Sequence, residues 1–416
     1  MTHCGEQDKS DKLINFRDRF YIPLASDGTQ VIYFAGNSLG LQPKSVRDYI
    51  NQELDDWKNL GVLGHHNAKN PWLPYHEFLT ENLAILSGAG EDEVVAMNSL
   101  TVNLHLLLVS FYRPKGKKYK ILIEDKSFPS DHYALQSQIL YHGFNPSDAL
   151  IEIKPRRNGY SINNEDIISF IEEHGDETAL ILFSGVNYFT GQAFEMDKIT
   201  EAGHNKGCIV GFDLAHAIGN IELKLHEWNV DFAVWCSYKY LNGGPGAVGG
   251  AFVHKRHLQD STIPKFWGWW GQNKSKRFDM DHVFQPIPTV ESWQLSNPPI
   301  FQLAALRASL DIFREAGISE LRKKSISLTG YCEKLINEFN DGRIDIITPS
   351  DPMQRGCQLS LKVKKDGRNL YQRLIRSNVI CDWREPDVIR IAPVPLYNNF
   401  SEVERFVKIL FSPDNA

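Results

Sequence analysis

The sequence has few cysteines and shows no pairing pattern among them. Its 416 residues include only six cysteines. They are scattered along the chain at Cys4, Cys208, Cys236, Cys332, Cys357 and Cys381. That spacing argues against a disulfide framework and against a zinc cluster. We therefore predict no metal site, and a buried or incidental thiol at each cysteine.

Three further absences narrow the class of protein. No apolar run is long enough to cross a bilayer, so no membrane association is predicted. The first residues, MTHCGEQDKSDKL, are polar and lack the apolar segment of a secretory signal, so a cytoplasmic location is predicted. The net charge of −6 gives no excess of positive charge, which argues against a nucleic-acid partner.

The composition is that of a globular protein, with 42% hydrophobic and 23% charged residues. A chain of this length predicts one large domain with a smaller companion. We predict an N-terminal arm associated with the small domain over 1–50, a large domain over 51–297 and a small C-terminal domain over 298–416. The pair Pro298-Pro299 marks the second boundary, because proline disfavours helix in the residue before it. Short strands alternate with helices before it, which predicts an α/β fold with a mainly parallel sheet, and the last hundred residues read as α+β.

Two short apolar runs organise the large domain. Cys208–Phe212 and Asp231–Trp235 both read as buried strands of a parallel sheet, since they are apolar on both faces. The first is followed by Asp213, and the second by Tyr238 and Lys239. A strand–helix–strand step is expected between them. Because the carboxyl ends of such strands open onto the ligand crevice, Asp213 and Lys239 are expected to face one site.

This pair suggests a chemistry. A lysine in a partly buried pocket can form a Schiff base with the aldehyde of pyridoxal phosphate. A carboxylate near the ring nitrogen keeps that nitrogen protonated, so that the ring accepts electrons. We predict that Lys239 holds the cofactor covalently and that Asp213 pairs with the pyridinium nitrogen.

Several positions could complete such a site, and each also has a structural explanation. Thr101 stands at a helix start, where free N–H groups attract phosphate, or it is an ordinary cap. Phe128 precedes another helix start and can lie against a planar ring, or it is a core residue. Arg390 ends an apolar strand and requires an anion, supplied either by a ligand or by a structural ion pair. The Gly-rich turn GNSLG (36–40) and the aromatic loop at 265–280 remain open in the same way.

Taken together, the motifs resemble one family. GFDLAHAIGN and WCSYKYLNGGPG are similar to the fold type I pyridoxal-phosphate enzymes of the class V aminotransferase type, and specifically to the kynureninases. GNSLGLQP, NSLTVNLHLLL, FPSDHYALQSQ, VNYFTGQ, SNPP and RIAPVPLYN match that family's pattern in the same order, from about residue 33 to 397.

The resemblance implies roles for individual residues. Lys239, Asp213 and Tyr238 would be catalytic. The cofactor shell would be formed by Leu100, Thr101, Phe128, Pro129, Ser130, Asp131, Ser184, Asp213, His216, Tyr238 and Lys239. In a homodimer, Trp269 and Asn297 would reach the cofactor from the neighbouring subunit. Arg390 would hold the substrate carboxylate, and Ser38, His65 and Asn297 would line the end that receives the aromatic amine.

The resemblance also implies a reaction. Kynureninases hydrolyse the Cβ–Cγ bond of L-kynurenine or 3-hydroxy-L-kynurenine to anthranilate or 3-hydroxyanthranilate and L-alanine, in tryptophan catabolism towards NAD. Asn297 with His65 and Ser296 is similar to the members that favour the 3-hydroxy substrate. The alternatives are another type I enzyme, such as a cysteine desulfurase or an aminotransferase, and a non-catalytic binding protein that keeps the fold.

Overall fold

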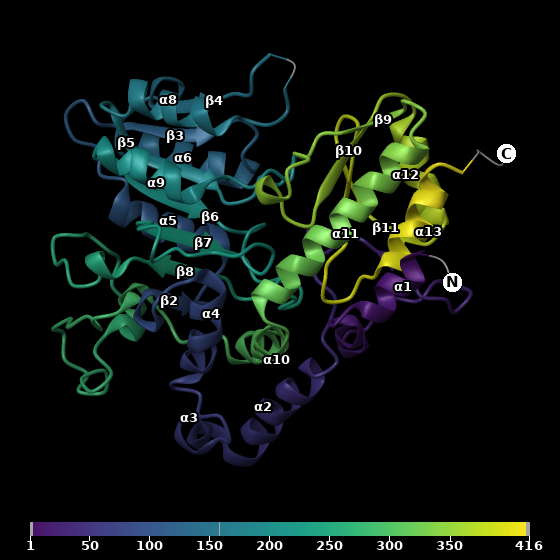
Figure 1. Ribbon diagram of the computed structural model, residues 1–416. Helices are drawn as coiled ribbons and strands as arrows, with labels where there is room; N and C mark the ends of the chain where they lie inside the picture. Colours follow the sequence, from purple (N-terminus) through teal and green to yellow (C-terminus); the bar gives the residue numbers. More distant parts are fainter. Residues whose placement is uncertain (1–2, 158, 413–416) are drawn as a thin grey trace.

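The computed structural model describes residues 3–157 and 159–412. Its largest element is a seven-stranded sheet with the order β2-β8-β7-β6-β5-β3-β4. The strands are β2 (Val94–Ala96), β3 (Lys120–Glu124), β4 (Leu150–Ile153), β5 (Thr178–Ser184), β6 (Ile209–Asp213), β7 (Phe232–Trp235) and β8 (Gly250–Val253). β4, β3, β5, β6 and β7 are parallel, and β8 runs antiparallel to both β7 and β2. The predicted α/β class with a mainly parallel sheet is confirmed (Figure 1).

Helices cover both faces of this sheet. α5 (Leu100–Phe111) and α6 (Pro129–Tyr141) lie on one face, and α8 (Asn164–His174) and α9 (Met196–Asn205) lie on the other. α4 (Thr80–Ser87) contacts β2, and α7 (Pro146–Ala149) contacts β3 and β4. α2 (Val46–Leu60), α3 (Gly64–Asn67) and α10 (Ile300–Ala316) pack beyond the sheet. Side chains of successive strand residues point to opposite faces. Accordingly, Leu180 and Leu182 pack with α5 and α6, whereas Ile181 and Phe183 pack with α8 and α9. This two-sided burial explains why the central strands are apolar on both faces.

The connection from β6 to β7 differs from the prediction. Residues 214–231 form a series of turns and contain no α-helix. Gly219, with φ of +72°, breaks any helix here, and Ile221, Leu223 and Leu225 fill the core from the turns. The two strands are nevertheless direct parallel neighbours, so the predicted proximity of their carboxyl ends holds.

A second, four-stranded antiparallel sheet has the order β12-β13-β10-β9. It contains β9 (Ile344–Ile346), β10 (Leu359–Val363), β12 (Asp382–Arg384) and β13 (Val388–Ile391), and its helices are α11 (Ile318–Phe339), α12 (Gly367–Arg376) and α13 (Phe400–Leu410). The single strand expected at 379–382 is two strands. β11 (Val379–Ile380) pairs with β1 (Ile32–Tyr33), and β12 then turns to pair with β13.

The N-terminal segment joins this second unit. α1 (His3–Ser10) packs against α13, and β1 lies parallel to β11. α10, in contrast, packs against α2 and α4, below the large sheet in Figure 1.

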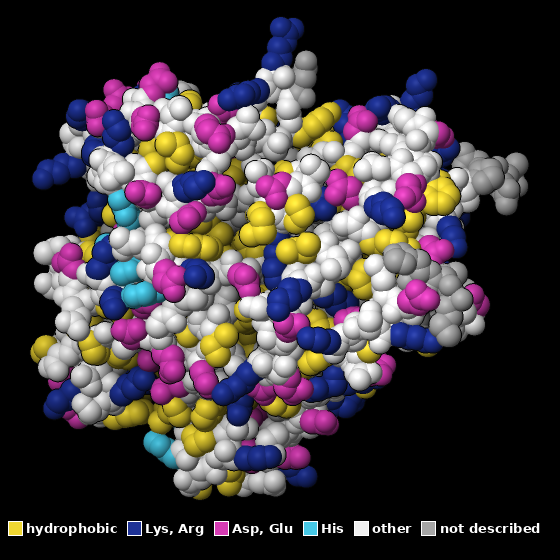
Figure 2. Space-filling model, viewed as in Figure 1, with side chains coloured by type: hydrophobic (Ala, Val, Ile, Leu, Met, Phe, Trp, Pro, Cys, Tyr) yellow, Lys and Arg dark blue, Asp and Glu magenta, His cyan; other side chains and the backbone are white. Residues whose placement is uncertain are grey.

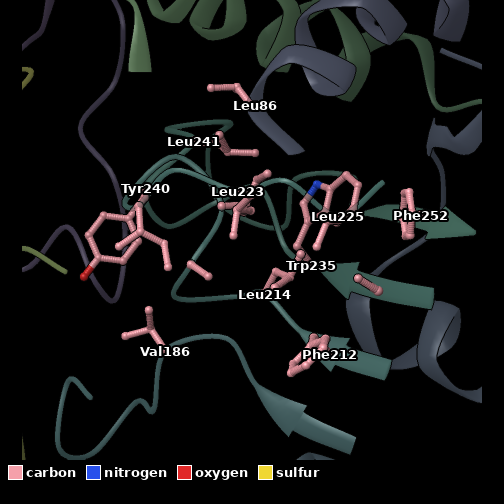
Figure 3. Packing of buried hydrophobic residues seen from close by; sticks show 14 of the residues in the cluster. Leu86, Val186, Phe212, Leu214, Leu223, Leu225, Trp235, Tyr240, Leu241 and Phe252 are labelled. Atoms are coloured by element: carbon pink, nitrogen blue, oxygen red, sulfur yellow. The ribbon is translucent and has the colours of Figure 1, made fainter. Parts of the chain in front are cut away.

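The core of the large unit is densely apolar. Trp235 of β7 is fully buried, and Figure 3 shows it between Phe252 of β8 and Phe212 of β6, with Leu214, Leu223 and Leu225 around it. Over the face seen in Figure 2, acidic and basic side chains are interspersed rather than segregated. Among the described residues, no helix combines the length and the apolarity needed to span a bilayer.

Candidate active site

Lys239 and Asp213 meet at the carboxyl ends of β7 and β6. Both line one cavity, with about 500 Å³ of space free of protein atoms. Lys239 is only 9% exposed, and its Nζ lies 5.7 Å from the centre of the Phe128 ring. The predicted convergence of the lysine, the carboxylate and the aromatic ring is therefore seen in the structure.

The turn at GNSLG supports the lysine from the other side. The amide of Gly40 donates to the carbonyl of Tyr238 over 2.8 Å. A Cβ on Gly40 would lie 2.3 Å from the carbonyl oxygen of Lys239, which is closer than any real Cβ contact. Glycine is therefore required at position 40, because the turn passes so close to the backbone of Lys239.

Asp213 shares its surroundings with a second buried acid. Asp131, in the first turn of α6, forms a side-chain hydrogen bond with Asp213. Burial and the charge of Asp213 raise the pKa of Asp131 well above its ordinary value. Burial also raises the pKa of Asp213, but the hydrogen bond from Asp131 and the charge of Lys239 act in the opposite direction. Asp131 therefore keeps the proton of the pair, and Asp213 is the carboxylate.

Two helix N-termini meet at one end of the cavity. Thr101 of α5 and Ser130 of α6 bring their hydroxyl oxygens to 2.9 Å of each other. Neither N-cap residue, Ser99 or Phe128, forms a side-chain capping bond. The first-turn N–H groups and the positive ends of both helix dipoles are thus available to an anion.

The remaining polar groups of the cavity are neutral. Burial and the nearby charge of Lys239 lower the pKa of His216 well below its ordinary value, and its Nδ1 is buried without a partner among the described residues. Burial and the adjacent Cys236 raise the pKa of Tyr238, which keeps the phenol protonated. Both residues, with Ser184, can exchange hydrogen bonds with a bound molecule.

This set of groups fits pyridoxal phosphate. An amine for the aldehyde, a carboxylate for the ring nitrogen, a helix-end cradle for the phosphate and an unpartnered imidazole nitrogen all open into one cavity. When bound, the cofactor would supply an electron sink for carbanion chemistry at an amino-acid substrate.

A buried arginine stands beside the cavity. Arg390 of β13 is 1% exposed and donates from Nη1 to the carbonyl of Tyr188 over 2.6 Å. Its Nη2 binds the carboxylate of Asp382 and, at 3.2 Å, the hydroxyl of Ser38. Its Nε has no partner among the described residues. The guanidinium is therefore held at both Nη atoms, and Nε is its one nitrogen without a partner among the described residues.

The sequence did not predict a role for Asp382, and it did not predict the hydrogen bond between Asp131 and Asp213. Asp382 follows a short apolar strand and carries no motif. It meets Arg390 only because β12 and β13 are paired in that register. The pairing of Asp131 with Asp213 likewise depends on how α6 docks against β6.

Three predicted site residues lie elsewhere in the single chain. His65, in α3, packs its ring against Trp72 at 5.4 Å. Trp269 is 42% exposed and donates from Nε1 to the carbonyl of Arg277, and Asn297 is exposed just before α10. None of the three lines the cavity around Lys239.

Comparison with known proteins identifies relatives along nearly the whole chain. A kynureninase of Koribacter versatilis is 56% identical over 403 residues, covering 97% of this chain and 95% of the relative. A kynureninase of Mus musculus is 49% identical, covering 97% of this chain and 91% of the relative. The chain belongs to the kynureninase family. In agreement, the model of the kynureninase C-terminal domain matches residues 321–410.

Solved structures confirm the fold. A C-DES mutant with glycine covalently linked to its PLP cofactor matches with a TM-score of 0.79 at 17% identity, over 95% of this chain and 99% of that one. The apo cysteine desulfurase of Thermococcus onnurineus matches with a TM-score of 0.76 at 17% identity, over 99% and 98%. Such low identity supports the architecture alone, whereas membership of the kynureninase family makes this chain a pyridoxal-phosphate-dependent hydrolase of kynurenines. The desulfurase and aminotransferase alternatives are less supported.

Proposed function

We propose that the cavity around Lys239 is where this chain cleaves the Cβ–Cγ bond of L-kynurenine or 3-hydroxy-L-kynurenine. The observation that carries the proposal is the convergence of Lys239, Asp213 and two uncapped helix N-termini on one buried cavity. The buried Arg390 beside it, with Nε unpartnered, provides for the carboxylate of an amino-acid substrate.

Each residue then has a definite task. Lys239 holds the cofactor and, once released, is the amine that moves the proton at the substrate α-carbon. Asp213 stays ionised against the ring nitrogen, because Asp131 keeps the shared proton. Phe128 would lie against the cofactor ring, and His216 and Ser184 would hydrogen-bond to the polar groups of that ring. Tyr238, protonated at neutral pH, relays a proton near the phosphate. The cradle at Leu100, Thr101, Pro129 and Ser130 takes the phosphate.

We further propose that the site is completed by a second copy of the chain. Trp269 and Asn297 are exposed and lie away from their own cavity. In a homodimer they would reach the neighbouring subunit's cofactor. The aromatic-amine end of the substrate would lie among Ser38, His65 and Asn297.

The three-part division of the chain also remains a proposal: an arm over 1–50, a large domain over 51–297 and a small domain over 298–416. The packing of α1 and β1 with α13 and β11 supports the association of the arm with the small unit.

The substrate preference is tested by assaying both kynurenines side by side. We expect anthranilate-type fluorescence to appear with each, with a higher kcat/KM for the 3-hydroxy form. Asn297→Thr is expected to change the ratio of the two kcat/KM values, because it replaces the amide that would meet the 3-hydroxyl group. An unchanged ratio would remove Asn297 from the substrate pocket, and absence of fluorescence with both substrates would refute the proposed function.

A further inference from the structure

A buried glutamate lies directly behind the cavity. Glu124 ends β3, Ser184 ends β5 and Asp213 ends β6, so the three side chains follow one another across the carboxyl edge of the sheet. Ser184 and Asp213 are paired in the strand register. Glu124 is fully buried and does not line the cavity, whereas Ser184 does.

Ser184 is bound to Glu124 through both its backbone and its side chain. The amide of Ser184 lies 3.2 and 3.3 Å from the two carboxyl oxygens of Glu124. The hydroxyl of Ser184 forms a close hydrogen bond with Oε1. Among the described residues, the Ser184 hydroxyl thus binds this one carboxyl group, and Ser184 also lines the cavity.

A serine hydroxyl has one proton to donate and two lone pairs to offer. While Glu124 is ionised it can only accept, so the Ser184 proton points at Glu124 and the cavity meets lone pairs. When Glu124 is protonated it can donate to Ser184, and the Ser184 proton is then free to turn into the cavity. The same hydroxyl is therefore an acceptor towards the cavity in one state and a donor in the other.

We propose that Glu124 is a positioning residue that sets the direction of the Ser184 hydroxyl, and thereby decides whether the cavity beside Lys239 and Asp213 presents an acceptor or a donor to the cofactor. This rests on the proposed function, because it requires the cofactor to occupy the cavity. Glu124 itself touches no reacting atom.

The burial of Glu124 places its change of protonation state near neutral pH. Burial, partly opposed by the hydrogen bonds from Ser184, raises the pKa of Glu124 to about 7. The ionisable groups that face it are Asp213 of β6, whose charge favours the protonated form of Glu124, and Asp131 of α6, which keeps its own proton. Its chain neighbours Asp125 and Lys126 line a different cavity, and the Lys126 ammonium lies over the Phe189 ring at 4.8 Å.

The test follows the visible absorption of the cofactor-loaded protein as a function of pH, without substrate. The wild type is expected to show a spectral transition near pH 7. Glu124→Gln cannot ionise and is expected to lose that transition. Ser184→Ala removes the hydroxyl that carries the effect and is expected to lose it as well. Glu152→Gln on β4, a half-buried glutamate that pairs with His132 and does not line the cavity, is the matched control and is expected to keep the wild-type profile.

The double variant tests whether Glu124 acts through Ser184. If Glu124 acts through Ser184, Glu124→Gln combined with Ser184→Ala gives the same profile as either single change. A spectral transition near pH 7 that persists in Glu124→Gln would overturn the inference. If the buried Gln prevents folding, persistence of the transition in Ser184→Ala would overturn it instead. So would additive effects in the double variant. Failure of the proposed function is seen separately, since the wild type would then show no cofactor absorption that borohydride reduces.

Discussion

At the scale of single residues, the sequence predicted the groups that carry motifs and missed those that depend on packing. Lys239, Asp213, Thr101 and Ser130 follow strands or begin helices, so their meeting at one edge of the sheet could be expected. Glu124 and Asp382 are acids at strand ends with no motif. Their importance comes only from what β5 and β13 place against them. Acids held by tertiary contacts leave no periodic signal in a sequence.

The role of Arg390 is tested by Arg390→Lys. A lysine keeps the charge but loses the planar pair of donors that matches a carboxylate. We expect KM for kynurenine to rise by about tenfold or more, with a smaller change in kcat, which steady-state kinetics would measure. Arg384→Lys is the matched control, because Arg384 also binds Asp382 but its side chain is 39% exposed, against 1% for Arg390. An equal rise in KM in both variants would contradict a carboxylate-binding role for Arg390.

At the scale of elements, the apolar runs Cys208–Phe212 and Asp231–Trp235 located β6 and β7 to within one residue at each end. The prediction was wrong between β6 and β7, because a helix was expected there and the structure has turns. A single strand was predicted at 379–382, whereas the structure has β11 in one sheet and β12 in another. In both segments, apolar side chains pack into a core that is built mainly by other helices and strands. A segment can fill such a core without being one continuous helix or strand.

The start of β7 is held to α9 and to the segment after β8 by one buried acid. Asp231 accepts from His204 at 2.8 Å, from His257 at 2.7 Å and from the amide of Val210 at 2.7 Å, and it pairs with Arg256. Burial alone would raise the pKa of Asp231, but these hydrogen bonds and the charge of Arg256 hold it well below its ordinary value. The resulting stability is therefore present above the unfolded pKa of about 3.9 and is lost as the pH falls below it.

Asp231→Asn removes that charge. At neutral pH we expect a loss of about 3 kcal/mol in the free energy of unfolding, since a buried ion pair is broken. The difference from wild type should shrink as the pH is lowered below about 4, as measured by denaturant unfolding at a series of pH values. Asp166→Asn, which breaks the exposed pair with Arg156, is the control and should cost below about 1 kcal/mol. A pH-independent loss in Asp231→Asn would contradict the electrostatic explanation.

At the scale of the whole molecule, one chain holds the cavity around Lys239 but places several predicted site residues outside its lining. His65, Trp269 and Asn297 do not line the cavity of their own chain.

Subunit mixing tests the shared site. One chain carries Lys239→Ala and the other carries Trp269→Ala with Asn297→Ala, and the two are co-expressed. In a homodimer with residues contributed across the interface, each mixed dimer has one intact site, so about a quarter of the wild-type sites should be active. Either parent alone should be inactive. No recovery of activity in the mixture would contradict the contribution of these residues across the interface.

The central claim is that Lys239 holds the cofactor in the cavity at the carboxyl ends of β6 and β7. It is tested most directly by reducing the purified yellow protein with borohydride and mapping the modified peptide by mass spectrometry. The account predicts that the colour bleaches, that the pyridoxyl group is found on Lys239 alone, and that Lys239→Ala yields no labelled peptide while keeping its fold. A label on any other lysine, or an unlabelled protein that retains kynurenine cleavage after Lys239→Ala, would contradict it.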